Sequence, residues 1–276
     1  MRKAWLIFIL ILSAVAVANA QDFLSWKLSD RYFSGQATFG FASYRGELKH
    51  NGSIQNEVSN ISLGLEARLW SRIAARIEIG RYNIRGHDKH ASDSSFYRQR
   101  NLSFSAVNYE ASVQGIFFMK KYAGDYYKRP QLDPYLLAGL GLTMLNPKTE
   151  MAGNNYNLWE YPTEDVSYSR WTMIIPLGAG LKWRISPFLN FNTEITYRYT
   201  FSDYLDDVSG NYSTSDNIVV QNLSNRKNEI DIVNEEAYDL MVPGSPRGDN
   251  SDKDAYLFLN FKFEFFLPPD MFSKKE

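Results

Sequence analysis

Two groups of residues in this 276-residue sequence could carry chemistry: its three histidines and a set of closely spaced aspartates. Imidazole nitrogens are common metal ligands, and His87 and His90 could form a pair. However, His50, His87 and His90 lie in predicted loops without a cysteine or a frame of carboxylates to complete a site. Ser94 and Ser95 follow His90, but a nucleophile needs a base held in hydrogen-bonding geometry, which neighbouring loop positions do not specify. We therefore expect no catalytic residue, no enzyme activity, no metal and no cofactor.

The aspartates are Asp203, Asp206 and Asp207. Carboxylates at this spacing could hold calcium, because calcium prefers several oxygen ligands. The glycine and the terminal glutamate of a calcium-binding loop are missing from this stretch. We therefore expect these aspartates to lie in a loop with their charges exposed to solvent.

Composition narrows the function further. The sequence contains no cysteine, which excludes disulfides, thiolate metal sites and a lipid anchor on cysteine. The formal net charge is −1, so no overall field points to nucleic acid. Aromatic residues make up 15% of the sequence, which favours sheets and membrane interfaces. We expect neither nucleic acid nor a small-molecule substrate as a partner.

The first 20 residues resemble a cleavable secretory signal. Arg2 and Lys3 precede an apolar stretch over residues 4–17, and small residues follow at Ala18 and Ala20. Residues 21–30 are then expected to form a periplasmic leader. No second stretch approaches the roughly 20 apolar residues of a membrane helix.

The elements that must position any site are strands. Apolar and polar residues alternate in each of eight runs, as in the second, where Leu63 and Leu65 share one face and Glu66 and Arg68 share the other. We expect an all-β protein: an eight-stranded antiparallel outer-membrane β-barrel over residues 31–267, with its last run pairing with its first and a periplasmic tail at 268–276. The runs cover residues 33–44, 61–69, 73–82, 107–117, 135–144, 175–184, 189–199 and 257–265.

The links between the runs alternate in length. Long links at 45–58, 86–102, 146–171 and 202–254 alternate with short or intermediate ones at 71–72, 118–131 and 186–187. Outer-membrane barrels have short periplasmic turns and longer outer loops. With both termini in the periplasm, every long link becomes an outer loop.

Charge decides which face meets lipid. A lysine or arginine that faces lipid at the bilayer centre costs about 2–4 kcal/mol, so the basic residues of the runs must face the lumen. A soluble lipocalin-like barrel, with its apolar face inside, is the alternative. Because an eight-stranded lumen is filled by its own side chains, we expect opposite charges to pair there and to block conduction; a selective channel would instead need a ring of one sign. The predicted lumen ion network comprises Glu66, Arg68, Arg76, Glu78, Glu110, Lys182, Arg184, Glu194, Arg198, Lys262 and Glu264.

The intermediate link at 118–131 mixes aromatic and basic residues. This composition suits either a membrane-interface belt or a protein contact. We expect outer-membrane lipid around the barrel and place the candidate partner contacts in this link. They are Lys120, Lys121, Tyr122, Tyr126, Tyr127, Lys128 and Arg129.

Several segments resemble the PorG-type outer-membrane barrels of the Bacteroidota type IX secretion system. The specific part is the block with Asp203, Tyr204, Asp206 and Asp207. The resemblance implies a non-enzymatic component of the secretion apparatus that anchors or docks periplasmic secretion-system proteins. A small outer-membrane channel and a structural or adhesion barrel are the alternatives. The similar segments are residues 100–104, 134–141, 146–147, 175–182 and 200–209.

Overall fold

The computed structural model describes residues 32–48, 57–92, 95–121 and 128–267. The predicted signal peptide (1–20), leader (21–30) and tail (268–276) lie outside the described residues. So do His50, Ser94, Tyr122, Tyr126 and Tyr127. Within the described ranges, no helix is both long enough and apolar enough to cross a membrane.

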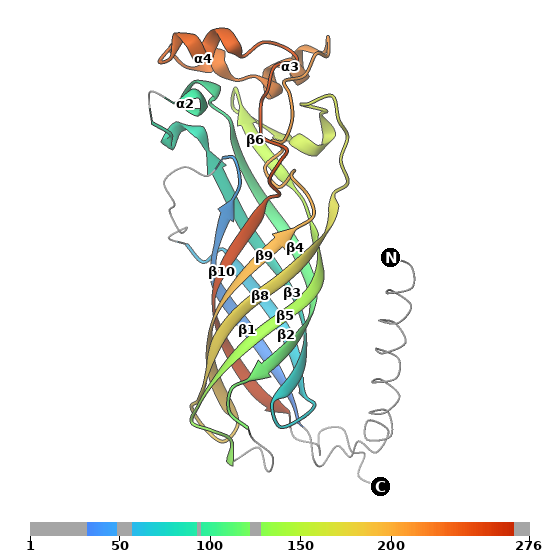
Figure 1. The fold of residues 1–276 in the computed structure, drawn as a ribbon, viewed down its shortest axis with the longest axis vertical. Coiled ribbons are helices and arrows are strands. Elements are labelled where there is room, and N and C mark those ends of the chain that lie inside the picture. Colours follow the sequence, from blue (N-terminus) through green and yellow to red (C-terminus); the bar gives the residue numbers. More distant parts are fainter. Residues whose placement is uncertain (1–31, 49–56, 93–94, 122–127, 268–276) are drawn as a thin grey trace, which may run out of the picture.

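Eight long strands close into an antiparallel barrel, as predicted (Figure 1). Each strand pairs with its neighbour in the chain, and β1 also pairs with β10, so that Thr38 lies opposite Lys262. The pairing of β3 with β4 completes a ring without a free edge. The barrel strands are β1 (Phe33–Arg45), β2 (Asn60–Arg68), β3 (Ile73–His87), β4 (Ser103–Phe118), β5 (Leu132–Met144), β8 (Trp171–Arg184), β9 (Leu189–Thr200) and β10 (Ala255–Leu267).

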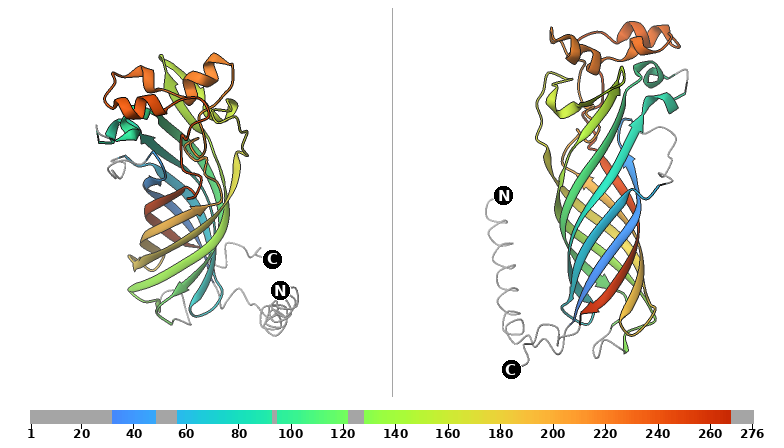
Figure 2. Two further views of the ribbon diagram at one scale, coloured as in Figure 1. Left: turned by 45° about the horizontal axis from the view of Figure 1, so that its top comes forward. Right: turned by 180° about the vertical axis from the view of Figure 1, so that it is seen from behind.

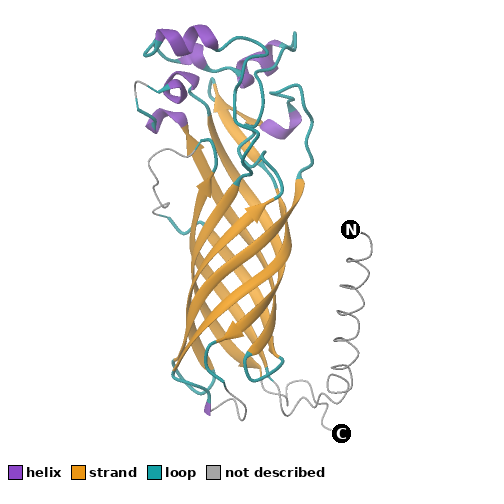
Figure 3. Ribbon diagram, in the orientation of Figure 1, coloured by secondary structure: helices purple, strands orange, loops and turns teal. Residues whose placement is uncertain are grey.

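The two ends of the barrel differ. The short links and both barrel termini lie at one end, which we call the turn end, and the long links gather at the other (Figure 3). The described residues of the four long links, 46–48, 57–59, 88–102 without 93–94, 145–170 and 201–254, are called the cap. The predicted alternation of long and short links is confirmed. The cap contains β6 (Pro147–Met151), β7 (Asn154–Asn157), η2 (Asp88–His90), α2 (Phe96–Arg100), η4 (Leu158–Glu160), α3 (Ile218–Ser224), η5 (Lys227–Glu229) and α4 (Glu235–Leu240).

The cap is continuous with the barrel wall on one side. The hairpin of β6 and β7 extends the sheet, because β6 pairs with the start of β4 through Ser105 and Lys148. The helices of the long 201–254 link lie farthest from the turn end, as the right-hand view shows (Figure 2). The strands slant across the barrel below them, as closure of a sheet requires.

The faces of the strands divide as the alternation predicts. Leu63, Ile77 and Leu140 point outward and are 63%, 58% and 58% exposed. Arg76, Arg198 and Lys262 point inward and are fully buried. The interior therefore carries the charges, which excludes the lipocalin-like arrangement.

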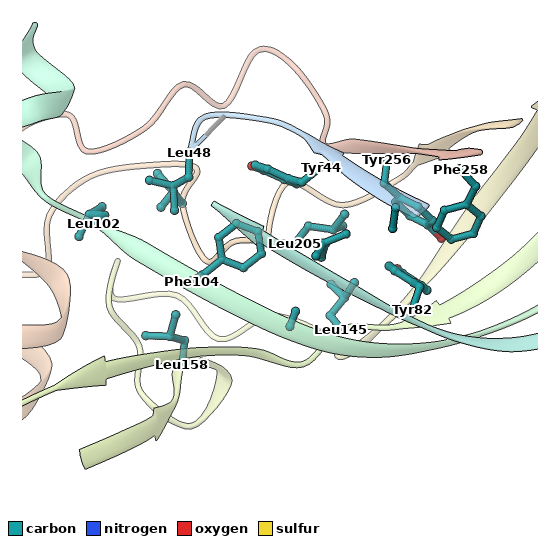
Figure 4. Close-up of a cluster of buried hydrophobic side chains, with 14 of the residues drawn as sticks. Tyr44, Leu48, Tyr82, Leu102, Phe104, Leu145, Leu158, Leu205, Tyr256 and Phe258 are labelled. Atoms are coloured by element: carbon teal, nitrogen blue, oxygen red, sulfur yellow. The ribbon is translucent and has the colours of Figure 1, made fainter. Parts of the chain in front are cut away.

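A second core lies where the barrel meets the cap (Figure 4). Leu48, Leu102 and Leu205 come from three different cap segments and are at most 3% exposed. They pack with strand residues such as Tyr44 and Phe104, whose rings meet at 4.9 Å. Burial of apolar area of this kind stabilises the contact between cap and barrel.

Candidate functional site: a filled lumen beneath a braced cap

The centre of the lumen is an ion-pair network around Arg76. The Arg76 guanidinium lies 2.7 Å from Glu194 and 3.2 Å from Glu66, and 3.9 Å from Glu78. Glu78 is on the same strand as Arg76, Glu66 lies opposite it on the neighbouring β2, and Glu194 reaches it from β9, which is not adjacent to β3. Removal of charge from water is costly unless the charges pair and their remaining groups form hydrogen bonds.

Two lysines extend the network toward the two ends. Lys182 lies 2.8 Å from Glu66 and 2.8 Å from Glu264. Lys262 lies 2.6 Å from Glu78 and 2.9 Å from Glu194. Opposite charges therefore alternate through the middle of the barrel.

Neutral side chains complete the solvation of these carboxylates. Gln36 donates to Glu66 at 2.7 Å, and Ser34 donates to Glu264 at 2.9 Å. The Tyr135 hydroxyl donates to Glu194 at 2.9 Å. Gly180 makes room for that ring, because a Cβ at this position would collide with Tyr135. The strand sequence thus provides both the charges and the space that they need.

A separate pair lies closer to the cap. Arg198 lies 3.2 Å from Glu110, and the Tyr256 hydroxyl donates to the same carboxylate at 2.6 Å. The guanidinium also sits over the Phe258 ring, 4.7 Å from its centroid. Above this pair, Tyr82 stacks on Tyr256 at 4.5 Å and meets Phe258 at 5.3 Å. We call these three rings the aromatic layer.

The predicted ion network is corrected at Arg68 and Arg184, whose hydrogen bonds to backbone place them at its margin. Both lie at the turn end and use backbone carbonyls. Arg68 donates to Trp70 and Ser71 and covers the Phe118 ring. Arg184 donates to the carbonyl of Arg129 at 2.8 Å. Their strand positions face inward as predicted, but at the end of a barrel the turn backbone is the nearest acceptor.

Two small cavities lie in the lumen. One cavity of about 10 Å³ is lined by residues that include Ser62, Glu78 and Glu110, and another of about 10 Å³ lies at the turn end beside Arg68 and Asp133. Each is about the size needed for a single water molecule. Among the described residues, the side chains of the ion-pair network occupy the lumen between these two cavities.

Two buried arginines brace the cap. Arg100 binds Asp88 through two hydrogen bonds of 2.7 and 3.0 Å and donates to the carbonyl of Arg247 at 2.7 Å. Arg247 in turn pairs with Glu164 at 2.8 Å and donates to the backbone of Ser224 at 3.0 Å. Three of the long links are thereby joined by charge-assisted hydrogen bonds.

The aspartates of the family-like block are buried, which corrects the prediction of solvated loop charge. Asp203, Asp206 and Asp207 are at most 2% exposed. Asp207 adopts a positive φ of 70° and accepts from Thr163 at 2.6 Å. It also accepts from the Tyr168 hydroxyl, whose ring stacks on Tyr204. Burial raises the pKa of Asp207 to about 6. The loop residues turn inward because the cap has a core of its own.

Two aspartates of this block belong to a larger acidic cluster, whose other two members the sequence did not reveal. We define the acidic cluster as Glu47, Asp203, Asp206 and Asp254. Burial, followed by repulsion from Asp206, raises the pKa of Glu47 to about 8. Burial raises the pKa of Asp206 to about 7. Burial also raises the pKa of Asp203 and, with repulsion from Asp206 and Glu47, that of Asp254. Glu47 and Asp254 were missed because they belong to links far apart in the sequence; the position of Asp254 directly before the last strand was the one available signal.

The remaining sequence candidates are scattered. The rings of His87, the last residue of β3, and His90, in η2, are 6.0 Å apart, and burial, with Lys89 next, lowers the pKa of His87 to about 4. Ser95 accepts from the backbone amide of Tyr97 at the start of α2. The structure thus gives these two histidines and Ser95 different surroundings.

The candidate partner contacts divide in two. Lys120, Lys121 and Lys128 are exposed at the turn end. Arg129 is 4% exposed and donates to Asn190 at 2.8 Å and to the carbonyl of Ser186 at 2.7 Å. Arg129 therefore holds the turn between β8 and β9, and its proposed role in partner contact is corrected.

Comparison with known families gives one match. Residues 38–231 match the family described as "Domain of unknown function (DUF6089)". The match covers more than half of the sequence, so the chain belongs to this family. No curated protein matches the chain.

Solved barrels resemble the chain at low identity. Neisserial surface protein A is 11% identical, with 85% of this chain and 96% of that chain covered and a TM-score of 0.39. A major outer membrane protein from Thermus thermophilus is 11% identical, with 86% and 99% covered and a TM-score of 0.42. The E. coli outer membrane protein W is 12% identical, with 87% and 100% covered and a TM-score of 0.40.

Proposed function

We propose that this protein is a closed outer-membrane barrel that conducts no ions and anchors or docks periplasmic components of a type IX secretion apparatus. The observation that carries the proposal is the combination of an apolar exterior with a lumen full of paired charges. An exterior of this kind favours lipid, and a lumen of this kind opposes transport.

The exterior supports the membrane part of the proposal. Leu65, Ile79 and Val113 are between 58% and 60% exposed, and such a belt is costly to leave in water. Aromatic residues flank the belt, with Trp70 and Trp183 toward the turn end and Trp171 toward the cap. On β3, the outward positions change from Ile79 to the exposed Arg81, where the polar surface begins.

The lumen supports the part of the proposal that excludes conduction. A pore would need a continuous polar path, whereas Arg76, Lys182 and Lys262 bind carboxylates from several strands at once. An ion could pass only if these pairs were broken. A structural or docking role at the two rims requires no such opening.

Planar-bilayer recording of the purified full chain tests the closed lumen. We expect no single-channel steps with the natural sequence. Steps with a stable unit size would favour the small-channel alternative instead. The measurement is independent of any partner.

The secretion role needs a cellular test. Deletion of the gene should abolish secretion of cargo that carries the C-terminal signal of this apparatus, and normal secretion would overturn the proposal. Charge reversal of Lys120 and Lys121, both exposed at the turn end, should reduce co-purification of periplasmic components by about tenfold or more, equivalent to about 1.4 kcal/mol. Reversal of Lys89 and Lys148, exposed in the cap, is the matched control and should leave co-purification unchanged. An equal loss with the control pair would overturn the assignment of docking to the turn end.

A further inference from the structure

The acidic cluster gathers carboxylates from three separate parts of the chain. Glu47 follows β1, Asp203 follows β9, and Asp254 directly precedes β10. One carboxylate oxygen from each of these three residues lies within 4.8 Å of the others. Gly46 permits this approach, because a Cβ there would collide with the Tyr44 hydroxyl and an Asp254 oxygen.

One oxygen in this cluster is buried without a partner. Asp203 is 2% exposed, and its Oδ2 accepts from the Ser209 hydroxyl at 2.7 Å. Its Oδ1 is also buried, yet no donor among the described residues reaches it. A buried acceptor left without a donor costs about 1–3 kcal/mol, and more if it carries charge. Because Asp203 lies beside two other carboxylates, this oxygen calls for a proton or a cation.

The hydrogen bonds of Tyr44 point the same way. Its hydroxyl oxygen lies 2.6 Å from Asp206 Oδ2 and 2.9 Å from Asp254 Oδ1. A phenol has one hydrogen to donate, so the Tyr44 hydroxyl donates a hydrogen bond to one of these carboxylates at a time. The second carboxylate then receives no hydrogen bond from Tyr44, and its negative charge is not offset by that hydroxyl.

The buried cations of the described cap are already engaged. Arg100 binds Asp88, and Arg247 binds Glu164 and lies 3.6 Å from Asp207. Lys253 is close enough to favour ionisation of Asp203, but its side chain is exposed to solvent. The acidic cluster therefore holds more negative charge than the described positive groups around it offset.

We infer that Glu47, Asp203 and Asp254 bind a divalent cation, with calcium as the preferred ion. Carboxylate oxygens from flexible connections suit calcium, which accepts six to eight oxygen ligands in variable geometry. Magnesium demands a nearly ideal octahedron and retains its waters, and softer metals prefer nitrogen or sulfur, which these three side chains do not offer. Bound calcium would tie the loop after β1 to both ends of the 201–254 link and to the mouth of the barrel.

Calcium titration of the detergent-solubilised full chain, followed by calorimetry, tests the site. We expect one calcium per chain with a Kd of roughly 10⁻⁴ to 10⁻³ M, as in extracellular calcium modules, and binding of magnesium at least about tenfold weaker. Asp203→Asn should weaken calcium binding by about tenfold or more. In chelator, Asp254→Asn should make the cap more resistant to proteolysis than the natural residue does, because it removes a repelling charge.

Asp207→Asn is the matched control. Asp207 is an equally buried aspartate in the same link, but it accepts hydrogen bonds from the Thr163 and Tyr168 hydroxyls. Its substitution should change cap stability while leaving the calcium Kd within about threefold. Glu47→Gln, at a half-buried position, provides a second site variant if Asp203→Asn does not fold. The inference fails if the natural chain binds no calcium up to about 10 mM, or if the site variants bind calcium as the Asp207 control does.

Discussion

The lumen and the acidic cluster are both buried and both rich in carboxylates, but they differ in whether those carboxylates have positively charged partners. In the lumen, Arg76 and Lys262 each contact carboxylates from more than one strand. In the acidic cluster, Asp203 and Asp254 lie next to other carboxylates, and the buried arginines nearby are bound elsewhere. The lumen has its counter-ions within the chain, whereas the acidic cluster requires protons or an external cation.

The difference follows from how each region is built. Strand register fixes which inward residues meet, so that Glu66 lies opposite Arg76 in the pairing of β2 with β3. Loops have no such register, and carboxylates can be brought together by the packing of the cap core around Leu48 and Leu205. Charge balance in the lumen is thus a property of the sheet, while charge imbalance in the cap is a property of loop packing.

The largest effect is expected from a break in the lumen balance. Arg76→Met leaves Glu66 and Glu194 facing each other without their shared cation. We expect a loss of about 3–5 kcal/mol in the free energy of unfolding, because a buried charge is left uncompensated. Urea unfolding of the detergent-solubilised protein, read by gel mobility before and after heating, measures the change.

Glu57→Gln is the control for this variant, since Glu57 is exposed beside β2. It should change the free energy of unfolding by less than about 0.5 kcal/mol. If Arg76→Met unfolds at the same urea concentration as the natural chain, the lumen network does not stabilise the barrel.

A smaller and more local effect is expected from the cap brace. Arg100→Met removes both hydrogen bonds to Asp88 and the bond to the carbonyl of Arg247. We expect the cap to lose about 1.5–3 kcal/mol of local stability while the barrel keeps its resistance to heat. Faster trypsin cleavage within 201–254, with unchanged heat-dependent gel mobility, is the expected readout. Lys89→Met, at an exposed cap residue, should leave both measurements unchanged; loss of barrel mobility in Arg100→Met would contradict a local role.

The acidic cluster predicts a pH dependence confined to the cap. The pKa of Glu47 is raised to about 8 and that of Asp206 to about 7, so the folded cap holds protons that the unfolded chain releases near pH 4. Stability must therefore fall as pH rises from about 4 to about 8, by on the order of 1–3 kcal/mol in chelator. Hydrogen exchange of the 201–254 amides measures it, and calcium should flatten the curve if it binds. A rise in stability over this pH range would contradict the burial of the acidic cluster.

The smallest effect is expected at an exposed carboxylate of the cap. Asp165 accepts from the Ser213 hydroxyl and from the backbone amide of Thr214, and these bonds lower its pKa. Asp165→Ala should accelerate exchange of the neighbouring amides by no more than about fivefold, since exposed polar contacts contribute about 1 kcal/mol or less. A larger effect would show that the 145–170 link depends on this contact for its fold.

The barrel could be predicted well from the sequence because the alternation of apolar and polar residues is a local property of each strand. Alternation in a run such as 61–69 fixes both the strand and its two faces, and the cost of charge in lipid places Arg76 and Lys262 inside. The order of long and short links then determines which end carries the loops. These features need no knowledge of tertiary contacts beyond pairing between neighbours.

The cap and the ends of the lumen were harder to predict. Burial of Asp203 and Asp207 depends on a core assembled from Leu102, Leu205 and other residues far apart in the chain, and no local periodicity encodes that contact. Arg129 and Arg184 carry the residue types of a binding surface or an ion network, but their acceptors include backbone carbonyls of the turns, whose positions the sequence does not specify.

The aromatic layer separates two electrostatic environments along the barrel axis. Tyr82 and Tyr256 stack across the lumen between the ion-pair network and the acidic cluster, with Phe258 against both rings. Charge added on the cap side, whether as protons or as calcium, is separated from the network by apolar ring faces. We therefore expect a change of protonation in the cap to leave the central ion pairs as they are.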